Sequence, residues 1–188
     1  MGGFSNISLQ KNHQRIAFDI SPVNVVLNYF AEKLGKNYDE NGDFARNGAI
    51  NFKILEQLNA LTFYQKSAPK SLGVEFVNSK VFPLLKDETP ENIIATFTEH
   101  IAEQIAKVFN DNQLKTVLVT GGGTFNTYLL EKIREKSQTE LIVPDENIIN
   151  FKEALIFAFM GVLRLRNEVN VLCSATGSSE NHCSGILV

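Results

Sequence analysis

The stretch LKTVLVTGGGTFNTYLLEKIR, residues 114–134, limits the fold of this chain more than any other segment. Residues 114–119 form a short apolar run with β-branched side chains, which indicates a buried strand. Gly121–Gly123 follow, and Thr124 or Asn126 is placed to cap the helix that comes next. The pattern predicts a strand, a glycine turn and a helix, as found in α/β folds.

Such a turn leaves backbone N–H groups pointing outward, beside the positive end of the helix dipole. It therefore favours a phosphate, or a ribose and base lying flat on bare backbone. The sequence fits neither G-x-G-x-x-G nor a Walker A loop, because no Gly-Lys-Ser/Thr follows. A tight turn without any ligand explains these glycines equally well, so the residues alone leave both interpretations open.

Composition excludes several classes of function. The net charge is -3 and the 18 basic residues are scattered, which argues against a nucleic-acid partner. No apolar run reaches the roughly 18–20 residues of a membrane-spanning helix, and the start of the chain lacks the features of a signal peptide. Cys173, Cys183 and three scattered histidines give neither a disulfide framework nor a metal site. We therefore expect a reduced, cytoplasmic protein with free thiols and no bound metal in the chain itself.

The first residues predict an antiparallel hairpin, with strands at 1–9 and 15–19. Asp19 ends the second strand, and Ser21 with Pro22 is expected to start a helix. A carboxylate at a strand end is where α/β folds place catalytic acids and bases. An Asp before Ser-Pro is also a common turn residue, so a structural role for Asp19 stays open.

Helical spacing predicts helices over 22–34, 51–59, 76–85, 90–108 and 151–166, and a further strand over 140–143. Gly35 is expected to end the first helix and Thr89 to cap the fourth. His100 lies off the apolar stripe and is expected to be solvated. Glu153 is expected in the first turn of the last helix, where the helix dipole alone would explain an acid.

Two polar segments complete the chain. The turn at 68–73 can present Lys70 and Ser71 to an anion, or it can be a solvated loop. Residues 174–184 are small and polar, and we expect a mobile end there.

Several segments together resemble the 1,6-anhydro-N-acetylmuramic acid kinase family. These segments, which occur in the family's order over nearly all of the chain, are GGFSNISL, FDISPVNVVLNYF, LGKNYDENGDFA, PKSLGVEF, VTGGGTFN, FKEALIFAFMGVLRLRNEVN and ATG. The resemblance implies a sugar kinase/Hsp70/actin fold, so residues 1–188 would form one RNase H-like C-terminal lobe with helices on a mixed sheet.

The resemblance also implies a reaction. ATP and Mg²⁺ phosphorylate O6 of an anhydro amino sugar from peptidoglycan recycling, while water opens the 1,6-anhydro ring and gives N-acetylmuramic acid 6-phosphate. Asp19 matches the family's base, and Glu153 and Asn24 match sugar-binding positions. The nucleotide-facing positions are matched by Gly2, Gly3, Gly121, Gly122, Gly123 and Asn126.

The chain departs from the family in two respects. Nothing here matches the Gly-Thr-Ser-x-Asp-Gly loop that holds the ATP phosphates, and the chain begins almost at the second lobe. The family's Phe-Asp-Thr-Gly-Pro-Gly-Asn is Phe-Asp-Ile-Ser-Pro-Val-Asn, so Ser21 and Val23 add side chains to the turn. We therefore expect an enzyme part that is active only with a missing N-terminal lobe. The expected partners of the chain are that lobe or a second copy in a homodimer. The alternatives are a degenerate nucleotide- or sugar-binding lobe and a product without any ligand.

Overall fold

An antiparallel hairpin opens the chain in the computed structural model, which describes residues 1–186. Strand β1 (Phe4–Lys11) pairs with β2 (Gln14–Pro22), and Ile7 lies opposite Phe18. Ile7 and Leu9 are buried while the alternate side chains of β1 are exposed, as the period of two in the sequence predicts. The register shifts between Ser5 and Asn6, which marks a bulge where the hairpin meets the site described below.

The segment around the glycines forms a parallel β-α-β unit. Strand β3 (Thr116–Leu118) pairs with β4 (Glu140–Ile142), and helix α6 (Thr127–Lys136) connects them. This confirms the predicted strand, turn and helix and the mixed α/β class. Among residues 1–186 the strands form two separate two-stranded sheets, so the single RNase H-like sheet stays a prediction.

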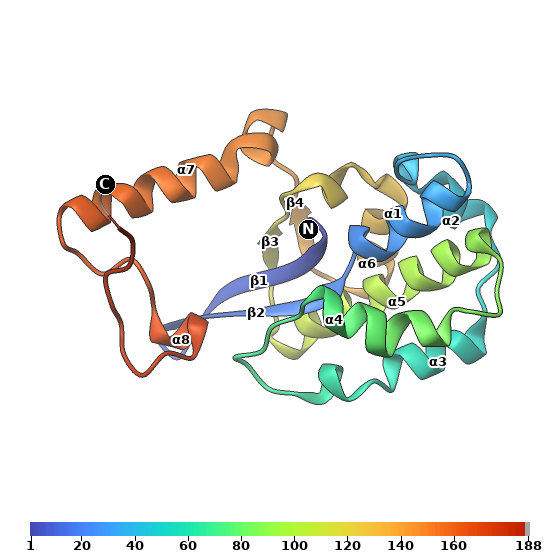
Figure 1. Cartoon of the computed structure of the whole chain (residues 1–188), viewed down its shortest axis with the longest axis horizontal. Coiled ribbons are helices and arrows are strands. Elements are labelled where there is room, and N and C mark those ends of the chain that lie inside the picture. Colours follow the sequence, from blue (N-terminus) through green and yellow to red (C-terminus); the bar gives the residue numbers. More distant parts are fainter. Residues whose placement is uncertain (187–188) are drawn as a thin grey trace.

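Helices make up most of the remaining structure (Figure 1). They are α1 (Asn24–Lys33), α2 (Asp43–Asn47), α3 (Phe52–Asn59), α4 (Val74–Phe76), α5 (Pro90–Asp111), α7 (Glu146–Leu165) and α8 (Cys173–Thr176). Short 3-10 turns occur at Glu40–Gly42, Thr62–Gln65, Phe82–Leu84 and Gly122–Phe125, and a π-helical turn at Val77–Val81. Within residues 1–186 no helix is long and apolar enough to cross a membrane.

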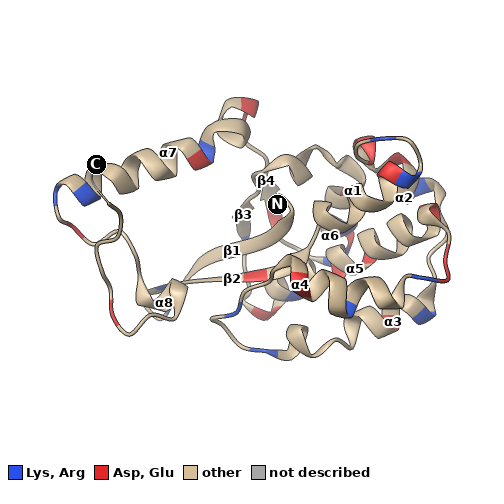
Figure 2. Cartoon of the chain, viewed as in Figure 1, with Lys and Arg blue, Asp and Glu red and all other residues tan. Residues whose placement is uncertain are grey.

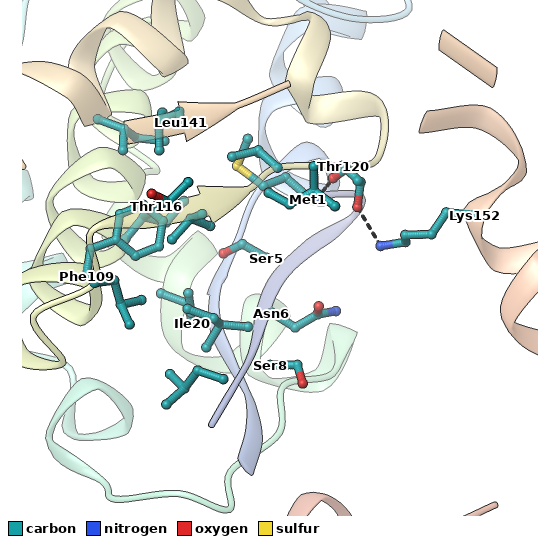
Figure 3. Close-up of a pocket in the computed structure, with 18 of the residues that line it drawn as sticks. Met1, Ser5, Asn6, Ser8, Ile20, Phe109, Thr116, Thr120, Leu141 and Lys152 are labelled. Atoms are coloured by element: carbon teal, nitrogen blue, oxygen red, sulfur yellow. Dashed lines mark hydrogen bonds between the residues drawn. The ribbon is translucent and has the colours of Figure 1, made fainter. Parts of the chain in front are cut away.

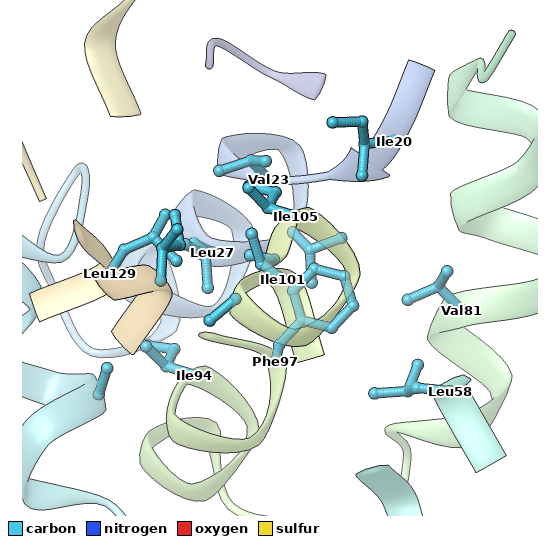
Figure 4. Packing of buried hydrophobic residues seen from close by; sticks show 14 of the residues in the cluster. Ile20, Val23, Leu27, Leu58, Val81, Ile94, Phe97, Ile101, Ile105 and Leu129 are labelled. Carbon is cyan, nitrogen blue, oxygen red and sulfur yellow. The ribbon is translucent and has the colours of Figure 1, made fainter. Parts of the chain in front are cut away.

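Helix α5 forms the centre of the hydrophobic core. Its Phe97 and Ile101 are completely buried, and they lie among side chains from α1, α3 and α6 (Figure 4). Thr89 accepts a hydrogen bond from the Asn92 amide and caps the helix, as predicted. Helix α5 contacts both β2 of the hairpin and α6, which follows the glycine turn, so it joins these two parts of the fold.

The expectation that His100 is solvated is wrong. His100 on α5 is fully buried, and its ring nitrogens lie 2.7 Å from Asn59 Oδ1 and 2.8 Å from Tyr64 Oη. Gln104 also donates to Asn59 Oδ1, at 2.8 Å. Polar partners from α3 and the following turn therefore satisfy the ring inside the core, which no spacing within α5 reveals.

The start of α1 also differs from the prediction. Ser21 and Pro22 lie in β2, and the helix begins at Asn24 without a side-chain cap. The backbone of Ser21 is held by Ser5, whose hydroxyl donates to the Ser21 carbonyl at 3.0 Å, and the Val23 amide donates to the Gly3 carbonyl at 2.8 Å. Ser5 on β1 and Gly3 just before it extend the pairing of β2, so long-range pairing overrides the local capping signal. Gly35 ends the helix at φ +79°, as predicted.

Helix α7 begins five residues earlier than predicted. Asp145 caps it by accepting from the Ile148 amide at 3.1 Å, and Pro144 precedes this cap. The first-turn acid is therefore Glu146, and the placement of Glu153 in the first turn is wrong. The helix projects from the body of the molecule (Figure 1), and of its 20 residues only Ile149 is buried.

The C-terminal segment returns to the hairpin. The predicted mobile end, residues 174–184, begins inside α8, and the Ser174 hydroxyl donates to the Arg15 carbonyl of β2. Val171 and His182 form an isolated bridge. Cys173 and Cys183 are both free thiols.

Candidate functional site

One pocket of about 560 Å³ brings together most of the predicted site residues. It lies where the start of β1, the end of β2, the glycine turn and the first half of α7 meet. Its walls include Gly2, Gly3, Asp19, Gly121, Gly122 and Glu153. These residues come from four segments that are far apart in the sequence, so the fold joins the predicted base, sugar ligand and nucleotide positions.

Two neighbouring pockets extend this space along α1. The first, of about 550 Å³, shares Gly2, Gly3 and Gly122 and adds Asn24. The second, of about 440 Å³, shares Asn24 and Gly122 and adds Asn126 with the aromatic side chains Tyr38 and Phe125. Because Gly122 lines all three pockets, we treat them as one cleft, the site cleft.

The glycine turn and the start of β1 form the junction of this cleft. The Gly123 amide donates to the Met1 carbonyl at 2.8 Å, and the Met1 amino group donates to the Thr120 carbonyl. A Cβ on Gly121, whose φ is +89°, would lie 2.7 Å from the Met1 oxygen. The absence of a side chain at Gly121 is therefore required by the fold itself.

The other glycines have different surroundings. A Cβ on Gly122 would meet only Asn24 Nδ2, at 3.9 Å, and a Cβ on Gly2 or Gly3 would meet nothing within 4 Å. These three positions leave open space for a ligand beside bare backbone. Gly123 is buried and packed against Met1, so it lies under the cleft and does not line it.

Asn126 has a structural role in addition to its place in the cleft. Its Oδ1 accepts from the Leu129 amide at 2.9 Å and caps α6, as one of the two predicted caps. The other candidate, Thr124, donates its hydroxyl to the Gly121 carbonyl at 2.6 Å and closes the turn. The end of the cleft that carries the predicted nucleotide positions is thus built on the N-terminus of α6, which favours anions.

Asp19 is held by the loop that contains Lys70 and Leu72, and the sequence pattern predicts no contact between this loop and Asp19. Its Oδ2 accepts from the Leu72 amide at 2.7 Å, and its own amide donates to the Lys70 carbonyl at 3.0 Å. Since one carboxylate oxygen is engaged by backbone, the carboxylate has a fixed orientation at the wall of the cleft. This is the arrangement that a positioned general base requires.

Helix α7 contributes Glu153 and a neighbouring lysine. Lys152 Nζ donates to Thr120 Oγ1 at 2.5 Å, which ties the helix to the glycine turn (Figure 3). Burial and the charge of Lys152 lower the pKa of the Met1 amino group to about 6, while Glu153 acts in the opposite direction. Lys152 and Thr120 were not predicted, although each directly precedes a predicted residue in the sequence.

Comparisons with known proteins identify the family of this chain. The family model described as anhydro-N-acetylmuramic acid kinase matches residues 1–188. The chain is 30% identical to the anhydro-N-acetylmuramic acid kinase of Francisella tularensis subsp. novicida over 95% of the chain and 51% of that protein. It is 32% identical to the Haemophilus influenzae kinase over 95% of the chain and 52% of that protein.

The kinase of Mannheimia succiniciproducens is 30% identical over 100% of the chain and 55% of its own length. The chain thus spans about half the length of the curated relatives it matches. Since the family model extends over all residues, the chain belongs to the anhydro-N-acetylmuramic acid kinase family.

Proposed function

We propose that this chain is the C-terminal, RNase H-like lobe of an anhydro-N-acetylmuramic acid kinase. In the complete enzyme, ATP would phosphorylate O6 of the anhydro amino sugar and water would open the 1,6-anhydro ring at C1. The product would be N-acetylmuramic acid 6-phosphate, within peptidoglycan recycling. The observation that carries the proposal is the single cleft shared by Asp19, Glu153 and the glycine turn.

The residues of the cleft divide by their chemistry. Asp19 would accept the proton of the attacking water, because its carboxylate is oriented by the Leu72 amide. Glu153 and Asn24 carry the polar side chains that would bind sugar hydroxyl groups. At the other end, Gly122 leaves backbone exposed for the nucleotide, and Tyr38 and Phe125 offer aromatic faces to a base.

ATP and its Mg²⁺ fit this donor set. Mg²⁺ would enter with ATP and be held mainly by phosphate oxygens and water, which suits a cleft whose carboxylates, Asp19 and Glu153, have other roles. When bound, the metal would neutralise charge on the transferring phosphoryl group. The chain's own part is to orient the nucleotide on the glycine turn and the sugar beside Asp19.

Activity is expected to need a second lobe. Phosphoryl transfer depends on positioning the nucleotide, acceptor and metal together, and this chain spans about half of its relatives. We propose that the phosphate-binding loop is supplied by an N-terminal lobe, fused or separately encoded, and that the isolated chain has negligible kinase activity.

The alternative is a non-catalytic lobe that keeps weak binding of nucleotide or sugar. The altered turn favours it, since Ser21 and Val23 add side chains next to Asn24. Both side chains are completely buried, however, and neither lines the cleft. Their burial supports the kinase-lobe proposal over the degenerate one.

Calorimetric titration of the purified chain tests the proposal. ATP·Mg²⁺ and 1,6-anhydro-N-acetylmuramic acid are titrated separately, with Gly122→Val and Glu153→Ala as variants. We expect Gly122→Val to abolish nucleotide binding and Glu153→Ala to abolish sugar binding. Addition of the N-terminal half of a related kinase should then restore turnover in the wild-type chain and not in Asp19→Asn. Binding without restored turnover would favour the non-catalytic alternative. If a folded chain binds neither ligand at millimolar concentration and the added N-terminal half restores no turnover, the site is dead and both proposals fail.

A further inference from the structure

A second pocket, of about 230 Å³, lies on the other side of β2 from Asp19. Phe18 and Ile20 line it, whereas Asp19 between them lines the site cleft, as expected from the alternation of side chains along a strand. Four lysines surround this pocket, which we call the lysine pocket. They are Lys11 on β1, Lys66 and Lys70 in the loop after the Thr62–Gln65 turn, and Lys107 on α5.

The positive charge of the lysine pocket has little compensation. Asp111 is the one carboxylate in its lining, and it pairs with Lys107 at 2.9 Å. Lys11, Lys66 and Lys70 form no ion pair within residues 1–186. The whole chain has a net charge of -3, so its composition does not explain why four lysines surround one small pocket.

The C-terminal end of α5, which lies at this pocket, does not compensate the positive charge of the lysines. Backbone amides of residues 112–114 already bind the carbonyls of Val108, Asn110 and Phe109, and the Asn112 side chain also donates to Val108. The terminal carbonyls of the helix are therefore satisfied, and the lysines gain little from the helix dipole.

Lys70 is held in place at the wall of the pocket. Its Nζ lies 3.3 Å from the Phe63 carbonyl oxygen and 4.6 Å from the centre of the Phe63 ring. Burial, and then the charges of Lys107 and Lys66, lower the pKa of Lys70. An ammonium group fixed among like charges is stabilised when an anion enters.

We propose that the lysine pocket binds a phosphate group, either as inorganic phosphate or as part of a small phosphate monoester. A doubly charged anion offsets the excess of positive charge more fully than a carboxylate does, and lysine binds phosphate as a point charge. The site is distinct from the site cleft and does not depend on the proposed kinase function. It adjoins the segment that holds Asp19, because Lys70 itself accepts from the Asp19 amide.

Titration calorimetry at constant ionic strength tests this proposal. Sodium phosphate and glycerol 3-phosphate are titrated into the wild-type chain and into Lys70→Gln, Lys107→Gln and Lys80→Gln. Lys80 is an exposed lysine outside the pocket and serves as the matched control. We expect saturable binding that is about tenfold or more weaker in each pocket variant and unchanged in Lys80→Gln. Circular dichroism of each variant verifies the fold.

The two titrants separate the possible sources of the phosphate group. Tighter binding of inorganic phosphate would indicate a site for the free ion, and tighter binding of glycerol 3-phosphate a site for a monoester; either supports the proposal. Binding that survives both Lys70→Gln and Lys107→Gln would locate the anion elsewhere and overturn it. Heats that never saturate, equal in all four proteins, would also overturn it.

Discussion

The amide of Leu72 donates a 2.7 Å hydrogen bond to Oδ2 of Asp19, across 53 residues of sequence. A second bond, from the Asp19 amide to the Lys70 carbonyl, runs in the opposite direction at 3.0 Å. The loop and the end of β2 are therefore joined at the position proposed for the general base. Any movement of the loop changes the orientation of the carboxylate.

Replacement of Asp19 by Ala should release the loop. The Leu72 amide loses its acceptor in Asp19→Ala, so its hydrogen exchange should become about tenfold faster or more, since a bond to a charged acceptor is lost. Asp19→Asn is the matched control, because the amide oxygen can still accept. Exchange rates measured by NMR check this, and equal Leu72 rates in Asp19→Ala and wild type would contradict it.

Two neighbouring glycines should respond differently to the same substitution. Gly121→Ala places a Cβ 2.7 Å from the Met1 oxygen at a positive φ, so the free energy of unfolding should fall by about 2 kcal/mol or more. Gly122→Ala meets no atom closer than 3.9 Å and should change stability by less than about 1 kcal/mol. Urea denaturation measures both values.

The Gly122→Ala variant also tests the cleft. Its new methyl group enters the space common to all three pockets, so it should weaken binding of ATP·Mg²⁺ although the chain is stable. Similar losses of stability in the two glycine variants would show that the turn does not have the described geometry. Unchanged nucleotide binding in Gly122→Ala would argue against nucleotide at this junction.

These glycines show what sequence patterns predict here and what they do not. The strand, turn and helix at 114–134 were predicted because their signals are local: an apolar run, glycines and a capping Asn126. Long-range contacts decided the other cases. Ser21 has a good local capping signal, but its pairing with Ser5 on β1 places it in a strand. The hydrogen bond from the Leu72 amide to Asp19 could not be predicted, because neither segment's sequence pattern indicates it.

His100 is the clearest failure of local reasoning, and its burial predicts how stability depends on pH. Burial lowers its pKa to about 3 in the folded chain, from an ordinary value near 6.5. Between about pH 3 and pH 6.5, the unfolded chain therefore binds a proton at His100 that the folded chain does not bind. Stability from this group is therefore complete above about pH 6.5 and falls as pH decreases toward 3.

The comparison of wild type with His100→Gln isolates this effect. Between pH 6 and pH 5 the free energy of unfolding should fall by about 1 kcal/mol more in wild type than in the variant, because only wild type carries the imidazole. Glutamine is neutral and can still donate and accept hydrogen bonds in the core. Urea denaturation at both pH values checks the difference. Parallel losses in the two proteins would show that His100 is not buried as described.

Helix α7 carries many of the exposed large apolar side chains of the described chain. Phe151, Leu155, Phe157, Phe159 and Leu165 are each at least 60% exposed. The middle of the helix has no charged residue to oppose contact with another apolar surface (Figure 2). A helix that is apolar on most of its circumference is normally covered in a folded protein. The isolated chain should therefore associate with itself.

Sedimentation velocity over a range of concentrations tests this association. The wild-type chain should show a weight-average mass that rises with concentration, and Leu155→Lys should shift the distribution toward monomer. Leu155 is 70% exposed, so the substitution leaves the core unchanged. Asn78→Lys is the matched control, because it adds the same charge at an exposed position away from α7. A wild-type chain that stays monomeric at high concentration would contradict the prediction. If Leu155→Lys and Asn78→Lys dissociate the chain equally, the added charge is the cause of dissociation and the apolar surface of α7 is not.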